Sequence, residues 1–240
     1  MSIEQNVTQV MDRIAAAARR VGRDPAEVTL VAVAKTFPAE AVVEACRAGV
    51  SIFGENRVQE AQLKIAAVAA ILGEGAVSWH MVGHLQRNKV NRAVSAFDVI
   101  HSVDSVRLAE ELEKRCAALV TEKRLPVLLE INVSREATKY GLPAGDRTQL
   151  DAVVKAILGL PHLGLQGLMT MAPIVAEPEG ARPYFRLLRR LRDELARQFP
   201  AAEWRHLSMG MTDDFEVAIE EGATLVRIGR AIFGRRQKIT

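Results

Sequence analysis

The chain has 240 residues, of which 49% are hydrophobic and 25% charged, which suits one large globular domain or two small ones. Lysine and arginine number 32 against 29 acidic residues, so the net charge is only +3. The basic residues are mostly spread out and aromatics make up 5%, so nucleic-acid binding is only a weak alternative. The longest apolar run, residues 65–72, is far shorter than the roughly 18 residues of a membrane span.

The two cysteines, Cys46 and Cys116, lie far apart in helix-like stretches and form neither a metal-binding spacing nor a disulfide framework. Acidic residues, Glu4 and Asp12, stand where a signal peptide would carry basic ones. We therefore expect a cytoplasmic protein with no metal site. No linker or low-complexity segment interrupts the chain, so residues 1–240 are interpreted as a single domain.

The chain begins with a helix pattern, in which Ser2 and Gln5 fit a capping box and Gly22 ends the apolar periodicity. Short apolar stretches then alternate with helix patterns. The expected strands are residues 30–35, 50–54, 77–83, 98–103, 126–133, 163–169, 204–209 and 224–229. The expected helices are residues 38–48, 57–72, 89–96, 104–120 with Asp104 as the cap, 146–158, 180–199 and 212–221, followed by a short turn at 230–233.

Eight strand-then-helix units in one chain of this length predict an α/β fold, a closed (β/α)8 TIM barrel with an extra N-terminal helix. An open doubly wound sheet is the alternative. It would carry a glycine-rich fingerprint after the first strand, and residues 35–38, Lys-Thr-Phe-Pro, are not one.

Polar residues stand at or near the end of almost every expected strand, where barrels of this kind place their active sites. They are Lys35, Glu55, Asn56, His84, Ser102, Asp104, Asn132, Ser208 and Arg227. A lysine at the end of a buried strand either reaches water or pairs with a carboxylate, or it serves as an amine nucleophile that forms a Schiff base. Lys35 alone does not decide between these roles.

The loops after the last two strands favour a phosphate site. Residues 207–212 contain a glycine and two residues with hydroxyl side chains, and residues 227–231 contain Gly229. A lysine and a phosphate site at the same end of the barrel indicate that the ligand is a phosphorylated aldehyde or ketone. The ligand would be pyridoxal 5′-phosphate or a sugar phosphate cleaved by a Schiff-base aldolase. Arg227 would either face the pyridine nitrogen or pair with a carboxylate such as Glu130.

Several segments carry a resemblance to a known family. They are residues 33–36 (VAKT), 54–60 (GENRVQE), 79–86 (WHMVGHLQ), 101–104 (HSVD), 167–170 (GLMT), 207–214 (LSMGMTDD), 226–229 (VRIG) and 231–234 (AIFG). In this set and order the chain resembles the pyridoxal phosphate homeostasis proteins, which look like the barrel domain of alanine racemase standing alone.

The resemblance implies that Lys35 carries a Schiff base to pyridoxal 5′-phosphate and that Arg227 faces the pyridine nitrogen. The phosphate would be held by Ser208 with the following backbone and by Gly229 with its neighbour. The implied cofactor-binding residues are Lys35, Asn56, Ser208, Met209, Arg227, Gly229 and Arg230. Arg230 is a departure, because many family members have a small hydroxyl residue at this position.

The resemblance also implies a function in pyridoxal phosphate homeostasis, holding the cofactor and passing it to apo-enzymes, without strong catalysis. An arginine on the ring nitrogen makes the ring a weaker electron sink, and no catalytic residue is assigned. The alternative is an amino-acid racemase or a related enzyme, which needs a second acid/base group. Alanine racemase takes that group from a second domain, although Tyr140 stays a candidate here. Without that domain's dimer contact, we expect a monomer.

Overall fold

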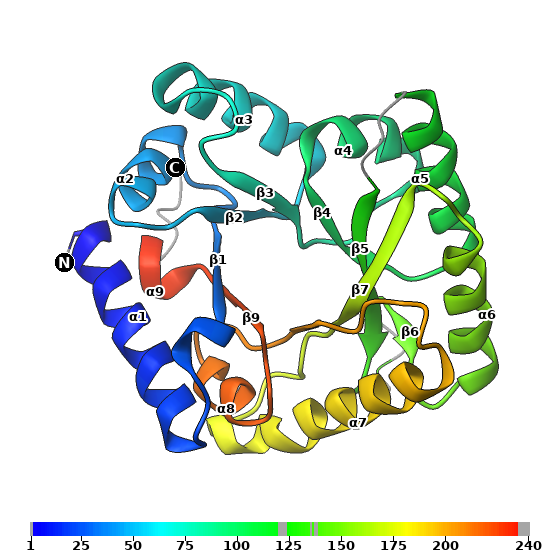
Figure 1. Ribbon diagram of the computed structural model, residues 1–240. Coiled ribbons are helices and arrows are strands. Elements are labelled where there is room, and N and C mark those ends of the chain that lie inside the picture. The colour runs from blue at the N-terminus through cyan, green and yellow to red at the C-terminus, as the bar shows by residue number, and fades with distance from the viewer. Residues whose placement is uncertain (1, 120–123, 135, 137–138, 235–240) are drawn as a thin grey trace.

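A computed structural model of the protein describes residues 2–119, 124–134, 136 and 139–234. Within them, eight parallel strands close into a barrel, because β9 pairs with β1 and β4 pairs with β5 (Figure 1). The strands are β1 (Thr29–Val33), β2 (Ile52–Glu55), β3 (Ser78–Met81), β4 (Val99–Val103), β5 (Leu125–Asn132), β7 (Leu163–Met169), β8 (His206–Ser208) and β9 (Leu225–Ile228). The predicted α/β barrel is confirmed.

Helices form a ring around the barrel (Figure 1). They are α1 (Ile3–Arg20), α2 (Ala39–Arg47), α3 (Val58–Leu72), α4 (Val90–Ala96), α5 (Val106–Ala118), α6 (Arg147–Leu158), α7 (Arg182–Gln198), α8 (Phe215–Glu220) and α9 (Arg230–Phe233). Short 3₁₀ turns occur at η1 (Pro25–Glu27), η2 (Arg87–Lys89) and η3 (Pro178–Ala181). The described helices include none with the length and apolar character of a membrane span.

The extra helix α1 lies outside the barrel, against α2, α8 and α9. Its predicted capping box is confirmed, since Ser2 Oγ accepts the Gln5 backbone N–H at 3.2 Å and Gln5 Oε1 accepts that of Ser2 at 3.1 Å. The Asn6 side chain donates to the carbonyl of Ile232 in α9 at 2.8 Å. The N-terminal helix is thereby tied to the segment that follows β9.

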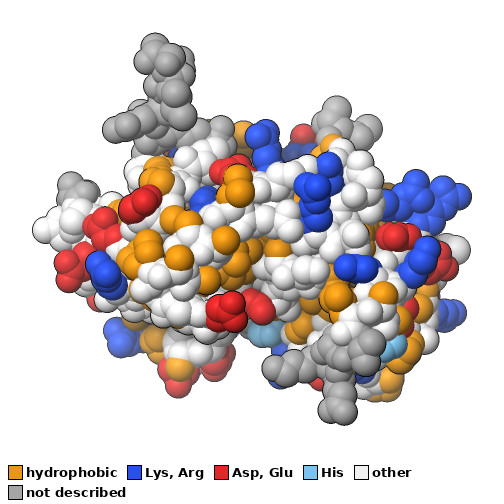
Figure 2. Space-filling model, turned by 90° about the horizontal axis from the view of Figure 1, so that it is seen from above, with side chains coloured by type: hydrophobic (Ala, Val, Ile, Leu, Met, Phe, Trp, Pro, Cys, Tyr) orange, Lys and Arg blue, Asp and Glu red, His pale blue; other side chains and the backbone are white. Residues whose placement is uncertain are grey.

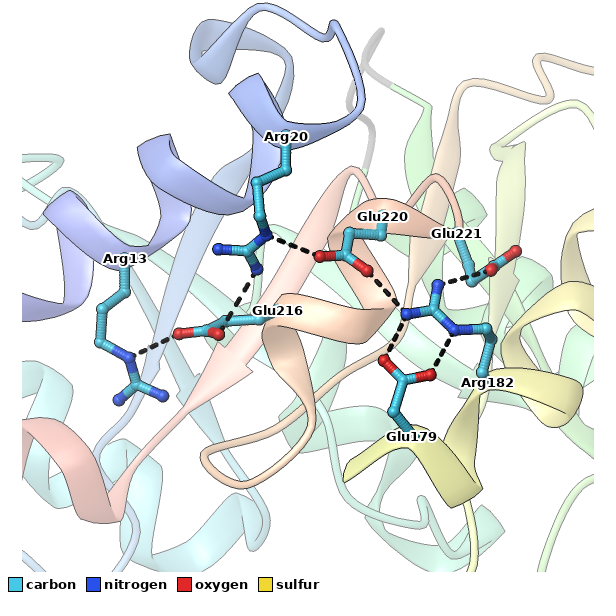
Figure 3. A network of polar contacts seen from close by, with 7 residues as sticks. All are labelled: Arg13, Arg20, Glu179, Arg182, Glu216, Glu220 and Glu221. Atoms are coloured by element: carbon cyan, nitrogen blue, oxygen red, sulfur yellow. Dashed lines mark hydrogen bonds and ion pairs between the residues drawn. The ribbon is translucent and has the colours of Figure 1, made fainter. Parts of the chain in front are cut away.

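An ion-pair network joins α1 to α8 and to the start of α7 (Figure 3). Arg13 pairs with Glu216 at 2.7 Å, and Arg20 donates to Glu220 at 2.8 Å. Arg182 reaches the Glu220 carboxylate at 2.7 Å from the other side. The network also includes Glu179 and Glu221. It fastens three helices side by side on the outside of the barrel.

The chain has two apolar cores, as strands that are covered on both faces require. The larger lies between strands and helices. A smaller one fills the barrel interior and consists of Val31, Val33, Val82, Leu128, Met169 and Leu225. Polar side chains lie beside this inner core, so the interior of the barrel carries both packing and chemistry.

One local prediction is wrong, and one short strand was not predicted. The cap of α5 is Ser105, whose hydroxyl accepts the Leu108 N–H at 3.3 Å, so the prediction of Asp104 as the cap is wrong. Asp104 instead turns its carboxylate toward His84. The loop after β5 also contains a short strand, β6 (Leu142–Pro143). It pairs in parallel with Ile131 and Asn132 at the end of β5 and is an addition to the eight strands of the barrel.

The helix α3 is apolar on more than its buried face. Its outward residues include Leu63, which is 79% exposed, and Ile71, which is 51% exposed. Figure 2 shows hydrophobic side chains gathered on the side of the molecule that α3 covers. A soluble protein usually places polar residues on such a face.

Candidate cofactor site

A cavity of about 480 Å³ opens at the carboxyl ends of the strands, a size typical of ligand pockets. It brings together five of the seven predicted cofactor residues, namely Lys35, Asn56, Arg227, Gly229 and Arg230. The loop after β7, residues 171–176, and the loop after β8, residues 211–214, form much of the remaining wall. A second cavity of about 430 Å³ also touches Lys35, Gly229 and Arg230.

Lys35 continues the inward-facing row of β1. Val31 and Val33 belong to the inner core, and side chains alternate along a strand, so residue 35 falls on the same face. Val31 pairs with Arg227 in the neighbouring strand, and both Lys35 and Arg227 line the larger cavity. The adjacent strands β1 and β9 therefore place Lys35 and Arg227 at the same cavity.

The turn that carries Lys35 is held from both sides. Thr36 has a φ of 68°, in the left-handed region that β-branched residues rarely adopt. Its N–H donates to Glu60 Oε1 at 2.5 Å, and the carbonyl of Ala34 accepts from Lys64 Nζ at 2.6 Å. Both side chains come from α3, so this helix fixes the backbone on either side of Lys35. Strain of this kind persists only where its surroundings enforce it.

Lys64 is a buried lysine that sequence reasoning missed. Its side chain is 6% exposed, and its ammonium lies 2.5 Å from Glu55 Oε1 at the end of β2. Burial raises the pKa of Glu55, whereas the Lys64 ammonium and, more weakly, that of Lys35 lower it. In the sequence Lys64 is one charged residue in a helix, and nothing in its spacing marks it as buried.

Arg227 is 4% exposed and spans the barrel interior. Its Nη1 donates to the Ser208 carbonyl and to Ser208 Oγ, each at 2.7 Å, and its Nη2 donates to the Thr170 carbonyl at 2.7 Å. Burial lowers the pKa of Arg227 to about 10, opposed by the charges of Glu130 and Asp214. A guanidinium has five N–H donors and these contacts use three, so Arg227 stays a cation with further donating capacity.

Ser208 and Met209 do not line either cavity around Lys35. Both are fully buried, and the Ser208 hydroxyl is engaged by Arg227 on one side and by His101 Nδ1 at 2.9 Å on the other. Ser208 therefore lies behind the cavity wall, where it supports the guanidinium.

A chain of hydrogen bonds continues from Ser208 across the barrel. His101 Nδ1 contacts Ser208 Oγ, and His101 Nε2 lies 2.9 Å from His80 Nδ1. Burial lowers the pKa of His80 to about 4 and that of His101 well below its usual value. Both rings are therefore neutral at pH 7, and each donates through one nitrogen and accepts through the other. The chain links β3, β4, β8 and β9.

The loop after β8 turns sharply beside Gly229. Gly210 has a φ of 91°, and an added Cβ would lie 2.5 Å from that of Ala218, so only glycine fits here. The Arg230 guanidinium pairs with Asp213, and both side chains are more than half exposed. The Arg230 side chain thus sits at the rim, and its backbone N–H is the part that a ligand in the cavity can approach.

Asn56 is placed by a close backbone approach. A Cβ on Gly83 would lie 2.6 Å from the Asn56 carbonyl oxygen, so a glycine is required where the loop after β3 crosses residue 56.

Known proteins that are similar to this chain identify its family. The family model described as "Alanine racemase, N-terminal domain" matches residues 6–237. A pyridoxal phosphate homeostasis protein from Aquifex aeolicus is 42% identical over 99% of this chain and 100% of its own length. The protein of the same name from Pseudomonas aeruginosa is 44% identical over 98% of this chain and 96% of its own.

The chain belongs to the pyridoxal phosphate homeostasis protein family. Among solved structures, that of PipY from Synechococcus elongatus with PLP bound is 36% identical, with a TM-score of 0.79 and coverage of 94% of this chain and 100% of that one. Alanine racemase from Clostridium difficile, at 12% identity and a TM-score of 0.67, shares the fold over 95% of this chain and 60% of its own.

The donor set of this family member fits pyridoxal phosphate. Lys35 offers a primary amine for an aldehyde, Arg227 a buried cation for a ring nitrogen, and Gly229 a half-buried backbone in the cavity wall for a phosphate. His101, Thr170, Glu60 and Lys64 were not predicted from sequence, because they act through their neighbours. Residues 54–60, 101–104 and 167–170 contain Glu60, His101 and Thr170 and were the available signal, whereas Lys64 lies outside them.

Proposed function

We propose that the chain binds pyridoxal 5′-phosphate as a Schiff base on Lys35 and serves pyridoxal phosphate homeostasis as a carrier, without strong catalysis of its own. The observation that supports this most is that the Lys35 amine and the Arg227 guanidinium open into the same cavity as Gly229. Homologues with the homeostasis name and the PLP-bound PipY structure support the same ligand.

Each proposed contact residue has a defined task. The bound aldehyde supplies the carbonyl carbon that the Lys35 amine attacks with loss of water. Arg227 would donate toward the pyridine nitrogen, and Asn56 would lie near the cofactor. The backbone of Gly229 and Arg230 faces the phosphate. We place Ser208 and Met209 behind this layer, with Ser208 acting through Arg227.

A carrier role follows from the charge of Arg227. A fixed cation opposite the ring nitrogen disfavours its protonation, so the ring stabilises carbanions poorly. Racemisation also needs an acid/base group on the second face of the substrate. Tyr140 does not line the cavity and instead stacks on His84 at 3.7 Å. A racemase is accordingly the second candidate function.

We further propose that the chain acts as a single-domain monomer in the cytoplasm and delivers the cofactor to apo-enzymes. Cys46 and Cys116 are free thiols, which suits a reducing compartment. A Schiff base suits delivery, because an amine on the recipient can displace Lys35 by imine exchange.

Equilibrium dialysis with pyridoxal 5′-phosphate tests the assignment. Lys35→Ala should weaken binding by roughly 100-fold or more, equivalent to about 2.8 kcal/mol. The matched control is Lys155→Ala, an exposed lysine on α6, which should bind as the wild type does. Equal binding by the Lys35 variant would overturn the proposal. Formation of D-alanine from L-alanine by the loaded chain, lost in Lys35→Ala, would favour the racemase instead.

A further inference from the structure

Three potential metal-ligating side chains meet at the barrel mouth, outside the cavity of Lys35. His84 follows β3, Asp104 follows β4, and Glu130 lies near the end of β5. These strands are neighbours, and in the barrel order β4 stands four places from β9 in either direction. The cluster thus occupies the wall opposite the strand that carries Arg227, and none of its members lines the Lys35 cavity.

The spacing of the three groups suits a common ion. One ligand atom from each residue lies within 4.8 Å of the others, and His84 Nδ1 is 3.5 Å from Asp104 Oδ2. Two ligands bound at about 2.1 Å in a tetrahedral arrangement stand ~3.4 Å apart. The His84–Asp104 pair already has this separation, and a Glu130 oxygen lies within 4.8 Å of both ligand atoms.

Two buried atoms of the cluster lack hydrogen bonds among the described residues. Glu130 is 2% exposed, and its Oε2 has no hydrogen-bond partner. His84 Nδ1 is also buried without a hydrogen bond, although it lies 3.5 Å from Asp104 Oδ2. Leaving a buried carboxylate oxygen unsatisfied is costly, and native proteins rarely do so without a reason. A cation between these atoms would satisfy both at once.

The ligands are also held in place by their neighbours. The ring of His84 stacks on Tyr140 with an interplanar angle of 8°. Ser105 donates its hydroxyl to Asp104 Oδ1 at 3.2 Å, so Oδ2 is the oxygen turned to His84. Outer contacts of this kind orient metal ligands in proteins.

An ion can reach the cluster from solvent. A surface cavity of about 360 Å³ is lined by His84 and Asp104. One imidazole and two carboxylates suit first-row divalent cations, with water completing the coordination. Arg87 and Arg107 border the same cavity, and Arg227 acts on Glu130 from the interior. These charges weaken the attraction for a cation, so we expect moderate affinity.

We propose that His84, Asp104 and Glu130 form a binding site for a divalent first-row transition-metal ion such as Zn²⁺. His84 and Asp104 are 20 positions apart, and Asp104 and Glu130 are 26 apart. Each residue lies near the end of a different strand, so the sequence shows no short metal-binding motif. Parallel strand order alone brings them together.

The test uses the full chain, freed of metal with a chelator, and Zn²⁺ alone as the probe. Calorimetric titration should show one ion per chain at the cluster. Glu130→Gln, which keeps the side-chain shape, and His84→Ala should each weaken this binding by at least about tenfold. The matched control is His162→Ala, because His162 Nδ1 pairs with Glu113 at 2.6 Å but lies in no described group of three ligands.

The control variant should bind Zn²⁺ as the wild type does. Absence of binding to the wild type would overturn the site, and so would binding that Glu130→Gln and His84→Ala leave unchanged. Circular dichroism checks that each variant is folded, and Asp104→Asn replaces any variant that is not. The readout needs no bound cofactor, so it is independent of the proposed function.

Discussion

At the scale of single residues, the position of Lys35 depends on Lys64. Lys64 holds the carbonyl of Ala34 and neutralises Glu55, and both contacts lie beneath the turn that presents Lys35. A buried pair of this kind adds little net stability, yet breaking it by removing one partner is costly. The pair therefore fixes geometry more than it stabilises the fold.

Lys64→Met should lower the free energy of unfolding by about 3–5 kcal/mol, because Glu55 would be left buried without its cation. Urea denaturation measures this loss. The double variant Lys64→Met/Glu55→Leu should recover most of it, since no isolated charge then remains. A single variant as stable as the wild type would show that the pair is not buried as described.

The neutral histidines predict an acid-sensitive barrel. The pKa of His80 is about 4 in the folded chain, below the unfolded value of 6.5, so the unfolded chain binds more protons between these pH values. His80 thus contributes stability that is present above pH 6.5 and lost as the pH falls toward 4.

The difference in unfolding free energy between the wild type and His80→Asn should accordingly shrink by about 3 kcal/mol from pH 7 to pH 4. Urea denaturation of both proteins at each pH measures it. The comparison cancels the titration of groups that do not interact with His80. A difference that does not change with pH would mean that His80 is charged or exposed in the folded chain.

At the scale of elements, α1 is held by its apolar face rather than by its ion pairs. Ile14 is 1% exposed, whereas Arg20 in the network of Figure 3 has a side chain 49% exposed. Exposed ion pairs contribute little, and buried aliphatic side chains contribute several-fold more.

Ile14→Ala should therefore cost about 2–4 kcal/mol in urea denaturation, and Arg20→Ala less than about 1 kcal/mol. Met11→Ala is the control on the same helix, because Met11 is 46% exposed and should change stability little. An Arg20 variant as unstable as the Ile14 variant would contradict this order.

The elements also show which features the sequence could predict. Strand 163–169 was predicted with the bounds of β7, because its apolar run is bracketed by a preceding turn and a following polar residue. Lys35 and Arg227 were predicted for the site, since polar residues at the ends of buried strands stand out. Lys64 was missed, because its burial results from packing between α3 and the strand ends. Ser105 was missed as the α5 cap beside Asp104, because both residues suit that role.

At the scale of the whole molecule, the apolar outer face of α3 is the surface at which a dimer could form in place of the proposed monomer. Leu63 and Ile71 would be covered if two copies met at this face (Figure 2). Their exposure in the single chain leaves an apolar surface that a monomer has to keep in water.

We expect sedimentation velocity to show a monomer for the wild type and for Leu63→Glu alike. The variant should also keep the unfolding free energy within about 0.5 kcal/mol, as surface substitutions usually do, and both proteins should unfold in one cooperative transition, as a single domain does. A wild-type dimer that Leu63→Glu dissociates would contradict the monomer and identify α3 as the interface.

The central claim is that Lys35 forms the covalent bond to pyridoxal phosphate. The most direct measurement is borohydride reduction of the cofactor-loaded chain, followed by mass spectrometric mapping of the trapped label. We expect a visible absorption band that reduction abolishes. The label should lie on the peptide that contains Lys35 in the wild type and in Lys155→Ala, and Lys35→Ala should carry no label. A label on another peptide, or one that persists in Lys35→Ala, would contradict it.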